Sequence, residues 1–306
     1  MDPLDFEATD TALHEGVAGR VVARDVIVVS GPDALSYLQG QCSQDVAALG
    51  IGESAEALLL SVQGKLEAYV RVLRAGDELV YVDLEHGYGE TALERLGRFK
   101  VRVKATLELR TWQLAEVRGP GAAAILAGLA PAEGVFAIGV EWPGYRGFDL
   151  LGETVGLPGG VAPGDDAAFE TARIEAGVPR MGAELTERTI APEAGIVGRT
   201  VSFTKGCYTG QELIARLDAR GNRVPWRLRQ VIVEDPEPAG LAPGDALIVG
   251  SKEVGTLTSV AFSPRLRATV ALAYLRRDAA PPLSVTVRSA SGEHAARVEA
   301  LPGSDD

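Results

Sequence analysis

The strongest constraint on the fold is a change of pattern near residue 225. Beyond this point the chain carries five short runs rich in valine, leucine and threonine, at residues 229–234, 246–250, 253–262, 267–275 and 283–289. Glycine, proline and aspartate separate these runs, as they separate strands joined by short turns. Five closely spaced strands predict a small β-barrel or sandwich. We therefore expect a C-terminal barrel domain at 225–306, preceded by a separate region at 1–224.

The first region mixes strand and helix patterns. Residues 27–29 read as a short strand, and the Ser-Gly-Pro-Asp sequence at 30–33 is typical of a helix start. Residues 117–126 repeat this Gly-Pro start, which fits either an old duplication or two separate uses of one helix-start sequence. Residues 57–85 read as strands with glycine-containing turns, and residues 165–177 as a helix that begins at aspartate and ends at glycine. The sequence predicts an α+β fold.

Composition and charge narrow the class of protein. Of the 306 residues 46% are hydrophobic, which is enough for two or three folded domains. Thirty Lys and Arg against 42 Asp and Glu give a net charge of −12, which argues against direct binding to nucleic acid. No run reaches the roughly 18 apolar residues of a membrane span. The two cysteines form no CxxC pair, so we expect a cytoplasmic protein without a metal site.

The segment KGCYTGQE at residues 205–212 carries the most chemical information. Thr209 followed by Glu212 matches a capping box, which predicts a helix that starts here and ends at Gly221. Cys207 would then lie just before a helix N-terminus and close to Lys205, and both features favour a reactive thiolate. The alternative is a buried cysteine that acts as a small hydrophobic residue. For Cys42 we expect this packing role.

A second feature of this region is its charge. Between Arg199 and Arg229 the chain has seven basic residues, including Arg216, and only two acidic ones. On a strongly acidic protein this segment is a candidate anion site, suited to a chain of carboxylates or of phosphates. A solvated helix face that pairs with acids elsewhere is the other interpretation.

These motifs resemble the YgfZ family, the folate-binding relatives of the glycine-cleavage T-protein that include iron–sulfur assembly factors. The resemblance rests on KGCYTGQE, on the ARIEAG sequence at 172–177 and on GTLTSVAFSP at 255–264, and it spans most of the chain. It implies mixed α/β subdomains around a central folate channel, the second at roughly 50–160, followed by the barrel. The implied cofactor is tetrahydrofolate or a derivative such as folinate, and the implied partners are iron–sulfur proteins or their assembly machinery.

The resemblance also implies site residues. Cys207 is the functional thiol, and the residues that would bind the cofactor are Arg173, Glu175, Lys205, Tyr208, Gln211 and Arg216. T-proteins carry an aspartate in a Gly-Gly-x-x-Asp-Asp block, and Glu67 stands at its place as the second candidate catalytic residue. Glutamate moves the charge by about one methylene, enough to misplace a catalytic hydrogen bond. The Tyr-Thr-Gly-Glu block of T-proteins is replaced here by residues 144–147, which lack the glutamate.

Three functions are compatible with these features. The first is a tetrahydrofolate-binding accessory protein for iron–sulfur cluster assembly or repair. The second is an enzyme, a folate-dependent aminomethyltransferase or demethylase. The third is a factor linked to tRNA modification that binds RNA through the arginine-rich segment, which we rank last because the chain lacks a basic domain.

Overall fold

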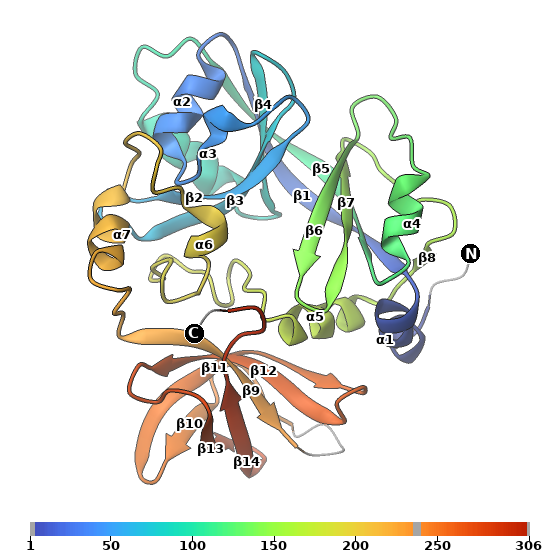
Figure 1. The fold of residues 1–306 in the computed structure, drawn as a ribbon, viewed down its shortest axis with the longest axis vertical. Coiled ribbons are helices and arrows are strands. Elements are labelled where there is room, and N and C mark those ends of the chain that lie inside the picture. The colour runs from blue at the N-terminus through green and yellow to red at the C-terminus, as the bar shows by residue number, and fades with distance from the viewer. Residues whose placement is uncertain (1–3, 235–239, 305–306) are drawn as a thin grey trace.

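The computed structural model describes residues 4–234 and 240–304. It consists of a region built on one eight-stranded sheet and of a closed six-stranded barrel below it (Figure 1). Seven α-helices are described: α1 (Phe6–Glu15), α2 (Ala34–Gln41), α3 (Gly89–Arg98), α4 (Ala122–Ala127), α5 (Asp166–Glu175), α6 (Val197–Thr200) and α7 (Gln211–Asp218), with a short 3-10 helix at Val46–Ala48. The expected α+β fold with a C-terminal barrel is confirmed.

The sheet has the strand order β2-β3-β4-β1-β5-β7-β6, and β8 pairs with the start of β1. Its strands are β1 (Ala18–Ser30), β2 (Ser54–Leu60), β3 (Leu66–Arg74), β4 (Leu79–Glu85), β5 (Thr106–Arg118), β6 (Phe136–Trp142), β7 (Tyr145–Gly152) and β8 (Ala162–Pro163). Residues 50–160, expected as one subdomain, therefore contribute strands to both sides of β1.

Two long strands hold the sheet together. β1 and β5 are 13 residues long each and pair antiparallel over their whole length, from Ala18 opposite Arg118 to Ser30 opposite Thr106. The first half of the sheet, β2 to β4, packs against α2 and α3, and the second half, β7 and β6, packs against α4. Because both halves share β1 and β5, they form one continuous framework around the centre of the molecule.

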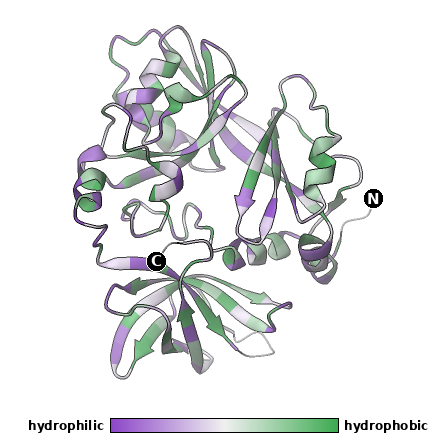
Figure 2. Cartoon of the chain, in the orientation of Figure 1, coloured by the Kyte–Doolittle hydropathy of each residue, from purple (hydrophilic) through white to green (hydrophobic). Residues whose placement is uncertain are grey.

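The barrel closes in the order β10-β11-β12-β9-β14-β13. Its strands are β9 (Trp226–Val233), β10 (Ala246–Val249), β11 (Lys252–Ser263), β12 (Ala268–Arg276), β13 (Leu283–Ser289) and β14 (Gly292–Glu299). Figure 2 shows apolar and polar residues alternating along these strands, as expected when one face of each strand points inward. The sequence pattern missed β14, because GEHAARVE contains three charged residues and one β-branched residue. Its inward side chains, Ala296 and Val298, are nevertheless buried.

Helix α5 joins the two parts. The side chain of Asp165 accepts hydrogen bonds from the backbone N–H groups of Ala167 and Ala168, which confirms the predicted aspartate cap. Ile174 on this helix packs in one apolar cluster with Leu228 and other side chains of the barrel. The barrel is therefore attached to the sheet region through a buried helix face, as well as through the chain connection at residues 224–226.

The packing of the core under the first half of the sheet can be tested at Cys42. Its side chain is fully buried in the core between α2, α3 and the first half of the sheet, and burial raises the pKa of its thiol to about 12. Cys42→Ser places a hydroxyl group in this core, so we expect a loss of about 1–3 kcal/mol of unfolding free energy. Cys207→Ser makes the same atomic change at an exposed position and should leave stability nearly unchanged. Chemical denaturation that gives equal midpoints for the two variants would contradict this assignment.

Candidate functional site

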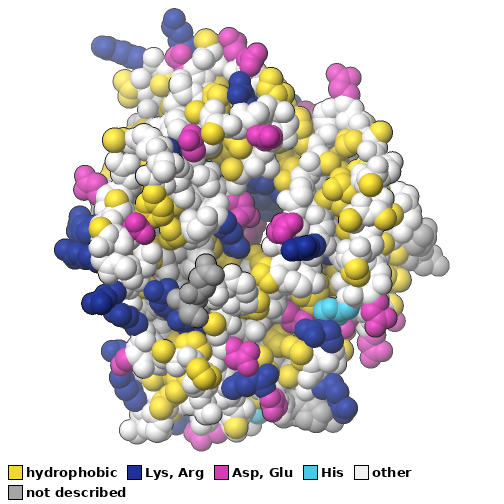
Figure 3. Space-filling view, viewed as in Figure 1, with side chains coloured by type: hydrophobic (Ala, Val, Ile, Leu, Met, Phe, Trp, Pro, Cys, Tyr) yellow, Lys and Arg dark blue, Asp and Glu magenta, His cyan; other side chains and the backbone are white. Residues whose placement is uncertain are grey.

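A cavity of about 370 Å³ lies between the two halves of the sheet and the segment that follows α5. Figure 3 shows the corresponding hollow at the centre of the molecule, with charged side chains inside it. Its walls carry six arginines and five carboxylates: Arg20, Arg24, Arg71, Arg118, Arg173 and Arg180, with Glu56, Glu85, Glu116, Asp149 and Glu170. Apolar and aromatic side chains complete the lining, among them Val22, Tyr69, Leu114, Val140 and Trp142.

The alternation of side chains along the strands places these residues on the face of the sheet that lines the cavity. On β1, alternate residues Arg20, Val22 and Arg24 line the cavity, while Val26, Ile27 and Val29 belong to apolar cores. On β5 the same spacing brings in Leu114, Glu116 and Arg118. Charged residues at every second position of a strand with apolar neighbours were visible in the sequence. They are the signal that could have located this site.

Buried ion pairs cross the cavity wall. The Asp149 carboxylate on β7 lies 2.7 Å from Arg71 Nη1 on β3 and 2.9 Å from Arg118 Nη1 on β5. The Asp83 carboxylate on β4 lies 2.6 Å from Arg71 Nη2 and 2.7 Å from Arg24 Nε. Because β3 and β7 belong to opposite halves of the sheet, the Arg71–Asp149 pair connects the two halves through space.

The electrostatics of Asp149 follow from this arrangement. Burial on its own would raise the pKa of the Asp149 carboxyl, but the guanidinium groups of Arg118 and Arg71 outweigh it and hold that pKa below its usual range. Asp149 is thus a carboxylate in the folded protein at neutral pH.

Aromatic rings provide flat surfaces in the same cavity. The guanidinium of Arg118 lies 4.7 Å from the centre of the Trp142 ring, and that of Arg199 lies 5.8 Å from the centre of the Tyr69 ring. Stacking with a guanidinium fixes the orientation of each ring. The site can therefore present both ordered aromatic faces and ordered hydrogen-bonding groups to a ligand.

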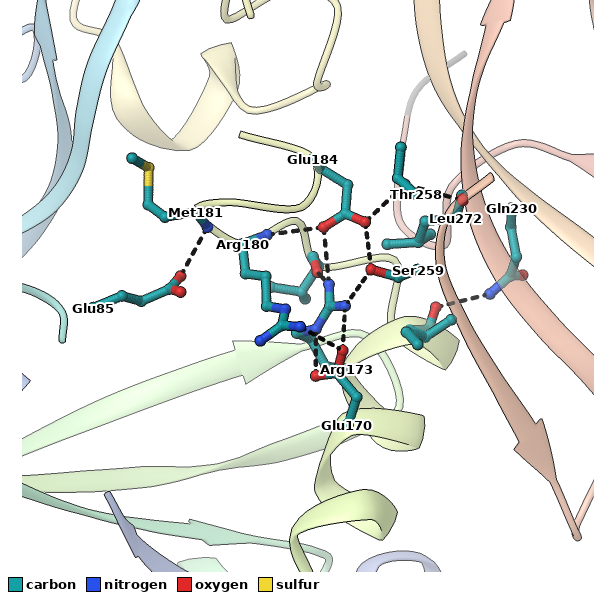
Figure 4. A network of polar contacts seen from close by, with 12 residues as sticks. Glu85, Glu170, Arg173, Arg180, Met181, Glu184, Gln230, Thr258, Ser259 and Leu272 are labelled. Carbon is teal, nitrogen blue, oxygen red and sulfur yellow. Dashed lines mark hydrogen bonds and ion pairs between the residues drawn. The ribbon is translucent and has the colours of Figure 1, made fainter. Parts of the chain in front are cut away.

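Arg173 is the predicted site residue that lines this cavity. Its guanidinium donates to Glu170, to Glu184 Oε2 at 3.2 Å and to Ser259 Oγ at 2.7 Å. Glu184 Oε1 in turn accepts from Thr258 Oγ1 at 2.8 Å and from Ser259 Oγ at 2.6 Å. Figure 4 shows the Glu184 carboxylate between Arg173 and these two barrel residues. The Arg173 side chain therefore forms part of the cavity wall and also holds the barrel against it.

Glu175 lies outside the cavity lining, in a separate polar cluster. Its Oε2 accepts from Tyr145 Oη at 2.5 Å and from Arg265 Nη2 at 2.9 Å, and His14 contacts both the tyrosine and the glutamate. Tyr145 belongs to the segment that replaces the Tyr-Thr-Gly-Glu block. The structure thus places this tyrosine and Glu175 between α1, α5 and a barrel turn.

Glu67 points away from the cavity. A β-bulge in the β2–β3 pair, where Leu59 faces Ala68 but Leu60 faces Leu66, leaves Glu67 as the extra residue. Its carboxylate lies 2.8 Å from Arg95 Nε and 3.5 Å from Arg98 Nη1, both on α3. Glu67 therefore lies on the helix-covered side of the sheet, whereas Tyr69 on the same strand lines the cavity.

The cysteine segment folds differently from the capping-box prediction, which is wrong. Helix α7 begins at Gln211, and its N-cap is Gly210 in a left-handed conformation, φ +83°, with no side-chain cap. The Gln211 Oε1 atom instead accepts from the backbone N–H of Tyr208 at 3.1 Å. The helix ends at Asp218, three residues before Gly221. A Cβ at Gly210 would lie 2.4 Å from the carbonyl oxygen of Ser61, so only glycine fits here.

Lys205 anchors this segment. Its ammonium group donates to the backbone carbonyls of Gln39, Cys42 and Gln44 at 2.7, 2.6 and 2.8 Å, which uses all three of its protons. Cys207 is exposed, whereas the Tyr208 ring is buried in a neighbouring apolar core. None of the residues 205–212 lines the cavity, so the structure separates the predicted cysteine segment from the central site.

The arginine-rich segment lies on the outer surface. The side chains of Arg216, Arg220 and Arg223 are exposed, and within the described part of the chain they form no ion pair or side-chain hydrogen bond. Figure 3 shows basic side chains along the left edge, over α7 and the connection into β9. Arg216 is therefore not positioned at the central cavity.

In the part of the chain that the structure describes, no group of three or more His, Cys, Asp or Glu side chains is arranged to hold a metal ion. None of the described helices combines the length and the apolar character that crossing a bilayer requires.

Comparisons with known proteins define the class. Residues 227–305 match the model of the glycine cleavage T-protein C-terminal barrel domain. The fold resembles the crystal structure of the glycine cleavage system aminomethyltransferase T from Bartonella henselae, with a TM-score of 0.81 and 21% identity over 96% of this chain and 88% of that chain. The protein thus has a T-protein-like fold.

Sequence relatives refine this class. An aminomethyltransferase of Rubrobacter xylanophilus is 28% identical over 90% of this chain and 82% of its own length. A tRNA-modifying protein YgfZ of Edwardsiella ictaluri is 29% identical over 64% and 65%, and an uncharacterized protein of Haemophilus influenzae is 29% identical over 76% and 80%. The chain is a relative of the YgfZ proteins and the T-proteins, which confirms the resemblance indicated by its motifs.

The ion pairs of the cavity wall can be tested by removing one charge. Asp149→Asn leaves Arg71 and Arg118 without their shared buried carboxylate, so we expect a loss of about 3 kcal/mol of unfolding free energy. Asp77→Asn makes the same change in the Arg74–Asp77 pair, whose carboxylate is exposed, and should cost less than about 0.5 kcal/mol. Urea denaturation of both variants gives the comparison.

The pH dependence gives an independent check of this prediction. Because the pKa of Asp149 is lowered on folding, its contribution is fully present above the ordinary aspartate pKa of about 3.9 and is lost as the pH falls below it. The stability difference between the wild type and Asp149→Asn should therefore shrink in acid. A difference that is absent at neutral pH would contradict the proposed link between the two halves.

Proposed function

We propose that this protein binds a reduced folate in the central cavity and acts as an accessory protein in iron–sulfur cluster assembly or repair. A folate-related role is supported by the relatives among YgfZ proteins and aminomethyltransferases. The observation that carries the proposal is the central cavity itself, which Arg173 of the ARIEAG motif lines together with aromatic and charged side chains.

The lining fits the chemistry of a folate. A pterin ring is flat and has a polar edge, and Tyr69 and Trp142 supply aromatic faces of matching character. The glutamate end of a folate is anionic, and Arg180 lies at the cavity with a half-exposed guanidinium. Arg118 also keeps a buried Nε–H that has no acceptor among the described residues. The cavity volume of about 370 Å³ lies within the usual range of small-molecule sites.

The residues of this chain would bind and orient the folate. The charged wall is held in place by ion pairs before a ligand arrives, so little reorganisation would be required on binding. A bound reduced folate would supply the capacity to carry a one-carbon unit. The apolar part of the lining would keep water from the ring.

The accessory role is favoured over aminomethyl transfer by the position of Glu67. The resemblance implies that in T-proteins the carboxylate at the position of Glu67 positions the folate nitrogen. Here that carboxylate is paired with Arg95 and Arg98 on α3, on the opposite side of the sheet from the cavity lining. We infer that the bound folate meets no carboxylate from this motif.

The iron–sulfur part of the proposal rests on the family resemblance and on Cys207. This thiol is exposed in a loop that Lys205 anchors, outside the cavity lining. An exposed thiol on an ordered loop is available to a partner protein while a folate fills the cavity. Cys207 is accordingly proposed as the functional thiol, acting at a surface apart from the folate.

Two other functions have specific support. Aminomethyltransferase is the name of relatives that match 84–90% of this chain, and it is the second candidate. A role linked to tRNA is the third, since related YgfZ proteins are named tRNA-modifying proteins and Arg216, Arg220 and Arg223 are exposed.

Folate binding is directly measurable. We expect calorimetry to detect binding of folinate at micromolar protein concentrations, and no binding of ATP or NAD, because the sequence has no phosphate-binding glycine loop. Trp142→Ala removes one aromatic wall and should weaken folinate binding by about tenfold or more, the usual cost of losing a stacked ring. Absence of heat with any reduced folate would refute the proposal.

The thiol should matter for function and not for folate binding. In cells that lack the native protein, we expect Cys207→Ser to fail to restore iron–sulfur enzyme activity, while the purified variant binds folinate like the wild type. Thr204→Ser, an exposed conservative change in the same loop, serves as the control. Full restoration by Cys207→Ser would remove the thiol from the function. Glycine cleavage with a lipoylated partner at the rate of a T-protein would establish the second candidate in its place.

A further inference from the structure

One carboxylate in the central cavity has no ionic partner among the residues that the structure describes. Four of the five carboxylates in its wall form ion pairs: Glu56 with Arg199, Glu116 with Arg20, Asp149 with Arg71, and Glu170 with Arg173. Glu85 is the exception, because no arginine, lysine or histidine nitrogen among the described residues lies within 4 Å of it. In a wall where charges otherwise neutralise one another, this carboxylate remains available to a ligand.

The backbone around Glu85 fixes its position. It is the last residue of β4, and in the β1–β4 register it lies opposite Arg24. The guanidinium of Arg24 is directed to Asp83 instead, at 2.7 Å. Glu85 Oε1 accepts from the backbone N–H of Met181 at 3.1 Å, as Figure 4 shows. One oxygen is therefore held by the segment after α5, whereas Oε2 has no partner among the described residues and is not sealed from solvent.

The surroundings of Glu85 restrict the kind of ligand. Burial raises the pKa of the Glu85 carboxyl, against the more distant positive charges of Arg24, Arg180 and Arg173. These three guanidiniums surround the site without contacting Glu85. A cationic ligand group would be attracted by one carboxylate but repelled by three arginines. A neutral group with adjacent N–H donors, next to a carbonyl acceptor, matches both the carboxylate and the arginines.

We propose that Glu85 recognises the 2-amino-4-oxopyrimidine edge of the pterin ring. Its carboxylate accepts from the ring N3–H and the 2-amino group, and an arginine on the far side donates to the 4-oxo group. This inference rests on the proposed folate function and specifies the part of the folate that the site reads. Glu85 is a specificity-determining residue, and the aromatic lining provides contact with the ring face.

The test is calorimetry on the full chain with folinate, comparing the wild type with Glu85→Gln. Glutamine keeps the size and the oxygen that accepts from the Met181 N–H, so the variant should fold normally, which an unchanged thermal midpoint verifies. It loses the charge and directs one amide N–H toward ligand donors. We expect folinate affinity to fall by about tenfold or more, the usual cost of losing a charged hydrogen-bond acceptor. Glu133→Gln, the same change at an exposed loop position, should have no effect.

A second ligand and the pH profile separate the possible outcomes. The pterin analogue 2,4-diamino-6-methylpteridine replaces the carbonyl by an amino group, and it should bind less tightly than 6-methylpterin to the wild type, because its extra donor faces the arginines. Wild-type affinity should fall as the pH is lowered through the raised pKa of Glu85. Glu85→Gln should lack this dependence, although Arg24, Arg173, Arg180, Asp83 and His86 remain in place.

The failure of this inference and the failure of the proposed function are distinguishable. If the wild type binds no reduced folate, the proposed function fails, and this inference with it. If the wild type binds folinate and Glu85→Gln binds it equally well, the folate site stands and the role of Glu85 is refuted. A loss of folinate affinity in Glu85→Gln without any loss for 6-methylpterin would assign Glu85 to another part of the folate and would equally overturn the proposal.

Discussion

The architecture around the cavity depends on the carboxylate of Asp149. It lies on β7 and contacts both Arg118 on the neighbouring strand β5 and Arg71 on β3, in the opposite half of the sheet. A sheet of this length could in principle splay open, since β3 and β7 are joined by backbone hydrogen bonds only through the intervening strands. The ion pair joins them directly. Removing this carboxylate would leave the buried Arg71 and Arg118 without the partner they share, so the pair opposes separation of the two halves.

A second set of contacts attaches the barrel to this framework. Arg173 contacts the cavity on one side and, through Glu184, the hydroxyl groups of Thr258 and Ser259 on the other. The position of the barrel and the shape of the cavity are therefore linked by one buried group of side chains. Thr258 and Ser259, the last two residues of the GTLTS sequence, act here as hydrogen-bond donors from the barrel surface. Their chemistry explains why this otherwise ordinary strand sequence carries two adjacent hydroxyl residues.

Much of the fold could be predicted from the sequence, because it depends on local patterns. The five barrel strands and the α5 helix follow from β-branched runs and from the Asp165 cap. Strand β14 could not be predicted from its own residues, because its pairing partners and not its own strand propensity stabilise it. Helix α7 starts after Gly210 and not at Thr209, because Gly210 lies in tight contact with the β2–β3 turn, which outweighs the capping potential of Thr209.

The candidate site was harder to predict, since it depends on contacts between distant segments. Arg173 lies at the cavity, as the family resemblance implies, but Lys205 and Tyr208 are used for the structure of their own loop. Their roles are set by side-chain direction and burial, which sequence spacing does not give. Glu85 had no motif around it and stands out only when every ionic partner in the cavity is known.

The β-bulge at Glu67 has a consequence for how this fold diversifies. Successive side chains of a pleated strand point to its two faces in turn, and here one face lines the cavity and the other packs against the helical layer. Counted by twos from Arg71 and Tyr69, residue 67 would face the cavity, and the bulge reassigns it to the helices. A change of one residue in strand length is thus enough to move an acidic group between a ligand and a structural ion pair without altering the motif that contains it. Within such a scaffold, insertions and deletions at a single bulge can alter chemistry as strongly as substitutions do.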